Sequence, residues 1–278
     1  MENMTLNKIA NEMGTPCYCY SKSYITDAFQ SFQKAFSKHP TQICFAVKAN
    51  SNIAILSLLA QLGSGFDVVS SGELARVIRA GGDPKKIVFS GCGKTKEEIF
   101  YALKNGVGCL NIESESELLR VNEVAKQLGI KAPISFRVNP DVDPNTHPYI
   151  STGLKENKFG IAYDRAVDVY KEAAELPNIE IHGVDCHIGS QITDTKPFLD
   201  AFDLLIKLIE ELKEADIVLK HIDLGGGLGV LYDNETPVKI EDYATKILEK
   251  MEGRSETLMF EPGRYIVANS GVMITEVQ

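Results

Sequence analysis

The sequence contains no apolar run long enough to cross a membrane, and its first four residues are not a basic segment leading into an apolar core. A membrane-spanning helix needs about 20 predominantly apolar residues, and a secretory leader needs that basic-to-apolar order. Positive charge is also scarce, because 29 basic residues face 38 acidic ones for a net charge of −9. We therefore expect a cytoplasmic protein with neither a membrane nor a nucleic acid as partner.

Disulfide and metal-binding patterns are missing as well. None of the six cysteines forms a CxxC pair, and the histidines lack the spacing of zinc ligands. Several cysteines fall inside strand-like runs, where a thiol behaves as a small apolar residue. We expect reduced thiols and no metal site.

The sequence does contain a regular alternation of apolar runs and amphipathic stretches. Strand-like runs occur at residues 43–48, 65–70, 87–91, 109–114, 134–140, 181–189, 221–225 and 258–262. Helical patterns separate most of them, at residues 52–62, 72–80, 96–105, 115–128, 164–176, 197–215 and 240–251. This alternation predicts an α/β fold, a (β/α)8 TIM barrel over residues 41–270. The competing doubly wound sheet would carry a glycine-rich turn after its first strand, and residues 48–51 contain no glycine.

Residues 1–40 are predicted to lead into the barrel through a helix at 5–13, a short strand at 15–20 and a helix at 24–37. The longest connection in the chain, residues 141–158, is rich in proline and polar residues. A connection of this length in a compact domain is usually functional and often forms a lid.

Lys48 ends the first barrel strand, directly after a buried apolar run. A lysine in that position is either a solvated strand end or a desolvated amine able to form a Schiff base. In (β/α)8 enzymes the active site lies at the carboxyl ends of the strands. In this chain those ends are rich in polar residues: Asp67, Ser70, Ser90, Asn111, Glu113, Arg137, Asn139, His187 and Ser190. This concentration favours the Schiff-base interpretation.

Three consecutive glycines, Gly225, Gly226 and Gly227, follow the seventh strand. Such a run is either a flexible turn or a cradle in which backbone N–H groups approach a phosphate. Barrel phosphate sites are often built by the loops after strands seven and eight. The eighth strand is followed by Arg264, which offers a bidentate contact to phosphate. We therefore predict a phosphorylated cofactor held by these two loops.

Glu261 closes the eighth strand after three apolar residues and is expected to be partly buried. A buried carboxylate needs a partner, and two candidates are Arg264 and the protonated ring nitrogen of pyridoxal phosphate. His187, placed by the pattern in the sixth strand, is either a hydrogen-bonded core residue or part of the same site. The chain has no nucleophile elbow, so acyl transfer is disfavoured.

Several motifs resemble those of the fold-type III pyridoxal-phosphate decarboxylases. The similar segments cover nearly the whole chain, at residues 46–51, 65–70, 89–91, 93–95, 137–140, 147–160, 187–191, 223–229 and 261–264. The lysine and glycine motifs mark the superfamily. Residues 147–160 resemble its diaminopimelate branch rather than its ornithine or arginine branches.

The resemblance implies that Lys48 holds the cofactor through a Schiff base, that His187 stacks on its ring and that Glu261 pairs with the ring nitrogen. It also implies a set of residues around the phosphate: Ser190, Gly225, Gly226, Gly227, Pro262, Gly263 and Arg264. Arg264 would further reach a substrate carboxylate. A lid containing His147, Tyr149 and Ser151 would close over the site and exclude water.

The implied reaction is the decarboxylation of meso-2,6-diaminopimelate to L-lysine and CO2, the last step of lysine biosynthesis. Two alternatives stay open: a decarboxylase of the same fold for ornithine, arginine or a polyamine precursor, and a non-catalytic barrel that binds pyridoxal phosphate. The resemblance also implies a C-terminal β-domain, which residues 271–278 would begin, and a homodimer for the full-length family member. Because that domain supplies substrate-binding residues, we expect cofactor binding by this chain to survive better than turnover.

Overall fold

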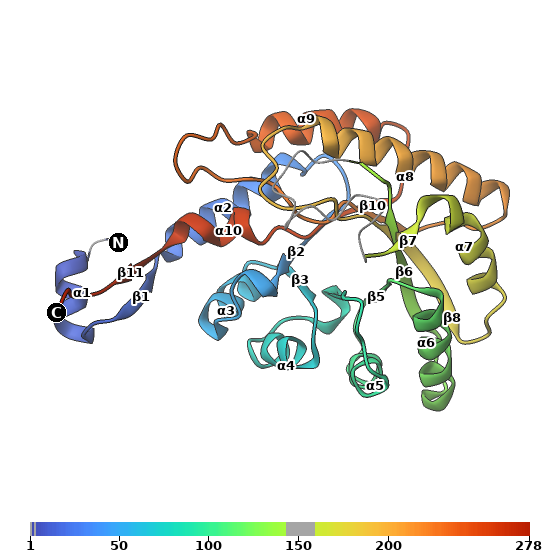
Figure 1. Ribbon diagram of the computed structural model, residues 1–278, viewed down its shortest axis with the longest axis horizontal. Coiled ribbons are helices and arrows are strands. Elements are labelled where there is room, and N and C mark those ends of the chain that lie inside the picture. Colours follow the sequence, from blue (N-terminus) through green and yellow to red (C-terminus); the bar gives the residue numbers. More distant parts are fainter. Residues whose placement is uncertain (1, 3, 143–158) are drawn as a thin grey trace.

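The centre of the molecule is a closed barrel of parallel strands (Figure 1). The structure is a computed structural model, which describes residue 2, residues 4–142 and residues 159–278. The barrel strands are, in order around the ring, β2 (Thr41–Ala46), β3 (Gly65–Val68), β4 (Ile87–Phe89), β5 (Cys109–Ile112), β6 (Ala132–Asn139), β8 (Ile179–Asp185), β9 (His221–Asp223) and β10 (Thr257–Phe260). β10 pairs with β2 and β5 pairs with β6, so the ring is complete. The predicted (β/α)8 barrel is confirmed.

Helices surround this ring (Figure 1). They are α3 (Ile53–Gln61), α4 (Ser71–Arg79), α5 (Lys96–Lys104), α6 (Glu115–Leu128), α7 (Ala166–Ala174), α8 (Lys196–Glu214) and α9 (Ile240–Lys250). Four of them begin where a polar side chain accepts a hydrogen bond from a backbone N–H of the first turn, at Asn52, Ser70, Thr95 and Ser114. Such caps fix the point at which each loop becomes a helix.

The helix α2 (Lys22–Ala35) precedes the barrel in sequence but packs between α9 and α3, so it completes the outer layer. An aromatic cluster holds it there. Phe36 lies 4.3 Å from Phe260 of β10, and Phe32 lies 5.2 Å from the same ring, measured between ring centroids. All three side chains are buried. Burial of this apolar surface attaches the N-terminal segment to the barrel.

A two-stranded antiparallel ribbon projects from the barrel (Figure 1). It pairs β1 (Cys17–Tyr20) with β11 (Gly271–Ile274), and α1 (Leu6–Met13) lies beside it. The remaining strand and α-helix among the described residues are the two-residue strand β7 (Ile161–Ala162) and the short helix α10 (Arg264–Val267). The division into residues 1–40, 41–270 and 271–278 stays a prediction. None of the described helices has both the length and the apolar character needed to span a membrane.

All eight barrel strands end earlier than the sequence pattern predicts, and two of these differences concern the site. The predicted strand 43–48 ends at Ala46, and Lys48 lies in the following 3-10 turn, Val47–Ala49. The predicted strand 181–189 ends at Asp185, which places His187 in the loop after β8. There the chain leaves the barrel ladder and pairs with the glycine loop instead, because the Ile192 N–H donates to the Gly227 carbonyl at 2.9 Å.

Candidate active site

A cavity of about 200 Å³ opens at the carboxyl ends of the barrel strands. It is lined by eight of the predicted site residues: Lys48, His187, Ser190, Gly227, Glu261, Pro262, Gly263 and Arg264. Gly225 and Gly226 precede Gly227 in the same loop but do not line the cavity. The predicted lid residues His147, Tyr149 and Ser151 lie outside the described residues.

Lys48 is held by a buried carboxylate. Its Nζ donates a hydrogen bond to Asp67 Oδ2 at 2.8 Å, and the Asp67 side chain is fully buried at the end of β3. About half of the Lys48 side chain (49%) stays accessible. Burial by itself would lower the pKa of this amine, but Asp67 and Glu261 outweigh it and raise the pKa above its ordinary value. Lys48 is therefore an accessible ammonium group in the cofactor-free chain.

His187 is fixed in its loop by the glycine run. The Gly226 N–H donates a hydrogen bond to His187 Nδ1 at 3.2 Å, so this nitrogen acts as the acceptor and carries no proton. Burial lowers the pKa of the imidazole well below its ordinary value, and the positive charges of Arg137 and Lys48 lower it further. His187 thus presents a neutral, flat ring to the cavity.

The glycine run is required by close packing of the loops. Gly225 has a φ of +64°, and a Cβ on Gly226 would lie 2.3 Å from the Glu261 carbonyl oxygen. The Gly225 N–H donates to Asp223 Oδ1 at 2.8 Å, and the Gly226 N–H is bound to His187. Two of the three N–H groups in the predicted phosphate cradle therefore position other site residues, and their contact with phosphate stays a prediction.

Arg264 lies at the start of α10 and is held by neutral oxygens. Its Nε donates to Ser190 Oγ at 3.1 Å, and its Nη1 donates to the Tyr232 hydroxyl at 2.6 Å. The guanidinium carbon also lies 5.7 Å from the centre of the Tyr232 ring. Among the described residues no carboxylate lies within salt-bridge distance of Arg264, so the ion pair with Glu261 considered from the sequence is not observed.

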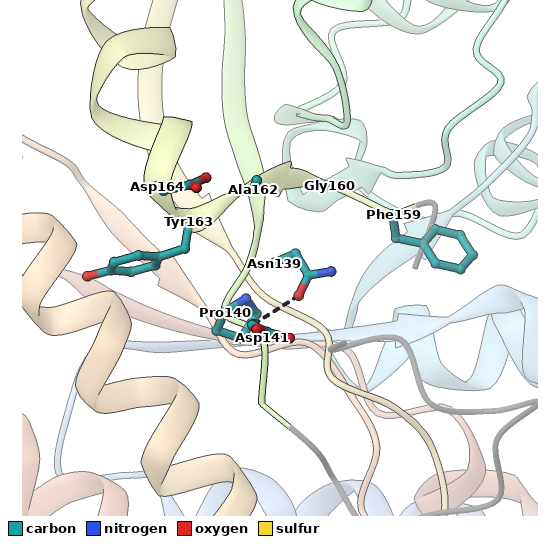
Figure 2. Close-up of a pocket in the computed structure, with 8 residues that line it drawn as sticks. All are labelled: Asn139, Pro140, Asp141, Phe159, Gly160, Ala162, Tyr163 and Asp164. Atoms are coloured by element: carbon teal, nitrogen blue, oxygen red, sulfur yellow. Dashed lines mark hydrogen bonds between the residues drawn. The ribbon is translucent and has the colours of Figure 1, made fainter. Parts of the chain in front are cut away.

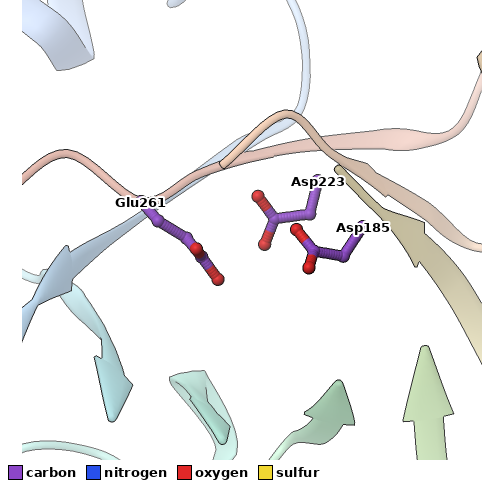
Figure 3. A group of neighbouring side chains, drawn as sticks. All are labelled: Asp185, Asp223 and Glu261. Atoms are coloured by element: carbon purple, nitrogen blue, oxygen red, sulfur yellow. The ribbon is translucent and has the colours of Figure 1, made fainter. Parts of the chain in front are cut away.

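Glu261 instead meets two other buried carboxyl groups, those of Asp185 and Asp223 (Figure 3). Asp185 and Asp223 were not among the site residues predicted from the sequence. A signal was present, because each is the last residue of a barrel strand, at the end where the active sites of barrel enzymes lie. Sequence reasoning also missed Tyr232, which lies in a polar loop with no motif of its own.

A second cavity, of about 260 Å³, lies beside the end of β6 (Figure 2). It is lined by Asn139, Pro140, Asp141, Phe159, Gly160, Ala162, Tyr163 and Asp164. The Asp141 N–H donates to Asn139 Oδ1 at 3.0 Å, which closes the turn after the strand. This cavity contains neither a lysine nor any predicted cofactor residue, so the cavity around Lys48 is the better candidate site.

Known proteins are similar to this chain in both sequence and structure. Residues 22–268 match the family described as pyridoxal-dependent decarboxylase, pyridoxal binding domain. Diaminopimelate decarboxylase of Pseudomonas fluorescens is 57% identical over 278 residues, and the match covers 100% of this chain and 67% of that protein. Diaminopimelate decarboxylase of Vibrio cholerae is 54% identical with the same coverage.

A solved structure gives the same result. Diaminopimelate decarboxylase from Helicobacter pylori complexed with L-lysine matches with a TM-score of 0.95 at 45% identity, covering 97% of this chain and 68% of that chain. This chain thus spans about two thirds of the length of these relatives. Since the family match covers nearly the whole barrel, and eight predicted cofactor residues share one cavity in it, the chain belongs to the pyridoxal-dependent decarboxylases and contains their pyridoxal-binding domain.

Proposed function

We propose that this chain is the cofactor-binding barrel of an enzyme that converts meso-2,6-diaminopimelate to L-lysine and CO2. The substrate is inferred from relatives that carry the name diaminopimelate decarboxylase at 54–57% identity over the whole chain. The resemblance of residues 147–160 to the diaminopimelate branch supports the same assignment.

The observation that carries the proposal is the charge pattern of the cavity around Lys48. Three groups line it: an accessible lysine, a glutamate with no described salt-bridge partner, and an arginine with no described carboxylate partner, which are Lys48, Glu261 and Arg264. Pyridoxal phosphate carries an aldehyde, a ring nitrogen that binds a proton, and a phosphate dianion. Each of these groups has a matching residue in the cavity, so the residues fit the cofactor.

When bound, pyridoxal phosphate supplies an aldehyde that condenses with amines and a ring that accepts the electrons released as CO2 departs. Lys48 is the amine proposed to anchor it, and Asp67 holds that amine in place beforehand. The neutral His187 ring offers a flat surface for stacking. Ser190 and Arg264 form the proposed phosphate contacts, with Gly227, Pro262 and Gly263 lining the same wall.

The proposal extends to a cytoplasmic homodimer for the complete enzyme, as the family resemblance implies. All six cysteines are free thiols, which supports a reducing compartment. Contributions from the lid residues His147, Tyr149 and Ser151, and from a C-terminal β-domain, belong to the same proposal.

The decisive experiment traps the cofactor on the chain. Incubation with pyridoxal phosphate, reduction with borohydride and peptide mass spectrometry should find the adduct on Lys48. The Lys48→Ala variant should lose it, while Lys96→Ala, which removes a lysine from an exposed surface pair, should keep it. An adduct spread over surface lysines and unaffected by Lys48→Ala would contradict the proposal.

The substrate is tested separately by measuring CO2 release from meso-diaminopimelate, ornithine and arginine. Release from diaminopimelate alone is expected. Release from ornithine but not from diaminopimelate would reassign the substrate. Trapping on Lys48 without release from any amino acid would make this chain a non-catalytic cofactor-binding barrel.

A further inference from the structure

Asp185, Asp223 and Glu261 lie at the carboxyl ends of the neighbouring strands β8, β9 and β10, and their carboxyl groups meet inside the barrel. One oxygen from each lies within 4.8 Å of the other two. Figure 3 shows the Asp223 carboxyl group between those of its two neighbours. The three residues are at most 5% exposed, and one oxygen of each has no hydrogen-bond partner among the described residues.

The cations that face this cluster already have carboxylates of their own. Lys48 Nζ lies 2.8 Å from Asp67 Oδ2, and Arg137 Nη1 lies 3.3 Å from Glu113 Oε1. The other titratable groups that face the cluster are thiols and phenols whose pKa values are raised by burial: Cys44, Cys109, Cys186, Tyr170 and Tyr243. These stay neutral at pH 7. Among the described residues, therefore, no cation lies within salt-bridge distance of the cluster, although the charges of Lys48 and Arg137 act on it.

Three buried carboxyl groups at this separation do not all ionise at neutral pH, because like charges and burial both oppose it. Burial raises the pKa of Asp223 to about 7, although the Gly225 N–H and the contact with Glu261 offset part of the effect. Burial also raises the pKa values of Asp185 and Glu261 well above their ordinary range, and the neighbouring carboxylates add to both. The cluster thus retains a proton.

We propose that Asp223 is a positioning residue that shares this proton with Glu261 through a hydrogen bond between their carboxyl groups, with Asp185 behind them. The Gly225 N–H already occupies Asp223 Oδ1, so the unpartnered oxygens Asp223 Oδ2 and Glu261 Oε1 are the ones left to share the proton. This hydrogen bond holds the Glu261 carboxyl group at the cavity wall, where the cofactor's ring nitrogen is proposed to bind. That last step rests on the proposed function, whereas the retained proton does not.

A metal ion in place of the proton is disfavoured by the surrounding charges. Lys48 contributes a positive potential at Glu261, and Arg137 contributes one at Asp185. A divalent cation in the cluster would sit between these two cations. A shared proton neutralises the cluster without adding a doubly charged ion to that environment.

The first test follows the stability of the cofactor-free chain by urea unfolding between pH 5 and pH 7. A carboxyl group whose pKa is raised on folding keeps a proton that the unfolded chain releases above about pH 4. Wild-type stability should therefore fall as pH rises toward 7. Since Asp223→Asn cannot titrate, the folding constant of the wild type should fall about tenfold per pH unit relative to the variant.

Comparing the wild type with Asp223→Asn cancels the effect of other groups that titrate in both proteins. Burial lowers the pKa of His221 to about 4 and that of His187 well below its ordinary value, which gives the opposite pH trend in both proteins. Parallel profiles for wild type and Asp223→Asn would overturn the proposal. Stabilisation by millimolar Mg²⁺ of the wild type but not of the variant would also overturn it, in favour of a bound cation.

Two further measurements apply if Asp223→Asn does not fold. Asp185→Asn is followed through the same pH series, with the same relative trend expected. Infrared absorption of the wild type should show a protonated carboxyl group at pH 6, where exposed carboxyl groups are ionised. A wild type with only ionised carboxyl groups at pH 6 would contradict the retained proton.

The second test asks whether Asp223 positions Glu261 for contact with the cofactor's ring nitrogen. Binding of pyridoxal phosphate is compared with binding of its 1-deaza analogue, in which carbon replaces that nitrogen. The wild type should prefer pyridoxal phosphate, Asp223→Asn should keep most of the preference because its amide still donates, and Asp223→Ala should lose about tenfold of it. An equal loss for both ligands would reduce Asp223 to a structural role. If Lys48 traps no cofactor while the pH series succeeds, the proposed function fails and the retained proton stands.

Discussion

At the carboxyl ends of the barrel strands, buried carboxylates on the two sides of the ring differ in whether they have a cation as partner. On the side formed by β3 to β6 and the helices that follow, each described buried carboxylate has a cation. Asp67 meets Lys48, Glu113 meets Arg137, and Glu117 meets Lys94 at 2.6 Å. At the carboxyl ends of β8 to β10, the cluster of Asp185, Asp223 and Glu261 has none, and Arg264 has no carboxylate, among the residues that the structure describes.

We infer from this difference that the paired groups on the β3 to β6 side stabilise the fold, whereas the groups without an ion-pair partner on the β8 to β10 side bind a ligand. A buried ion pair whose members satisfy each other needs nothing more, although removing one member leaves an uncompensated charge. Glu261 and Arg264 line the cavity around Lys48, and neither has an ion-pair partner among the described residues. A ligand with an anion at one end and a proton-binding nitrogen at the other would satisfy both, which is why the β8 to β10 side is the proposed binding side.

The largest expected effect on stability comes from breaking an ion pair on the β3 to β6 side, where each described buried carboxylate has a cation. Lys94 is buried, and its Nζ donates to Glu117 and to the carbonyl oxygens of Gly91 and Asn111 at 2.6–2.7 Å. Lys94→Met keeps the length of the side chain but leaves Glu117 buried without its cation. We expect a loss of about 3–5 kcal/mol in the free energy of unfolding, measured by urea denaturation at pH 7.

A matched control lies nearby, between α5 and α6. Lys96 and Glu123 also form a 2.6 Å pair, but both side chains are about half exposed (53% and 52%). Lys96→Met should therefore cost about 0–1 kcal/mol. Equal losses for the two variants would show that burial does not distinguish these pairs and would remove the basis of the comparison.

The sequence predicted the barrel and most of its cavity for physical reasons that are local. Alternating strand and helix patterns determine the fold class, and the carboxyl ends of parallel strands converge, so Lys48, Ser190, Glu261 and Arg264 could be grouped without a structure. His187 was grouped with them correctly but placed on a strand, although it lies in a loop.

The carboxyl cluster could not be predicted in the same way. Asp185 and Asp223 are register partners on adjacent parallel strands, and register depends on the stagger of the closed barrel rather than on either segment alone. The hydrogen bonds that the Gly225 and Gly226 N–H groups donate to Asp223 and His187 depend on how three loops pack against one another. Neither feature leaves a periodic signal in the sequence.

A smaller effect is expected from removing the partner of the reactive amine. Asp67 and Glu261 raise the pKa of Lys48 against the effect of burial, so Asp67→Asn should lower it. More of the amine is then unprotonated at pH 8, and adduct formation with pyridoxal phosphate should become about tenfold faster, because a partner charge at this distance shifts a pKa by about one unit or more. Stopped-flow absorbance across pH 6 to 9 measures the rate.

Asp168→Asn, which removes an exposed carboxylate from α7, is the control and should leave the rate unchanged. A slower reaction in Asp67→Asn would give Asp67 a different role. It would then act as the base that takes the proton from Lys48, rather than as the group that holds Lys48 charged.

The smallest expected effect is on cofactor affinity and concerns Arg264, the cation with no carboxylate partner among the described residues. The Tyr232 hydroxyl accepts a hydrogen bond from Arg264 at 2.6 Å on an exposed loop, while Ser190 holds the same guanidinium from the other side. Tyr232→Phe removes one of these contacts and leaves the ring in place. We expect pyridoxal phosphate to bind about 2–10-fold more weakly, as the loss of about 0.5–1.5 kcal/mol implies.

Measuring the affinity for pyridoxal, which has no phosphate, tests whether the effect of Tyr232→Phe acts through the phosphate contact. If Arg264 meets the phosphate, Tyr232→Phe should not change the affinity for pyridoxal, and Tyr18→Phe on the exposed β1 strand should change neither affinity. An equal loss for both ligands would mean that Tyr232 shapes the cavity as a whole. Arg264 would then be a structural cation like Lys94, and the difference between the two halves of the barrel would rest on the carboxyl cluster alone.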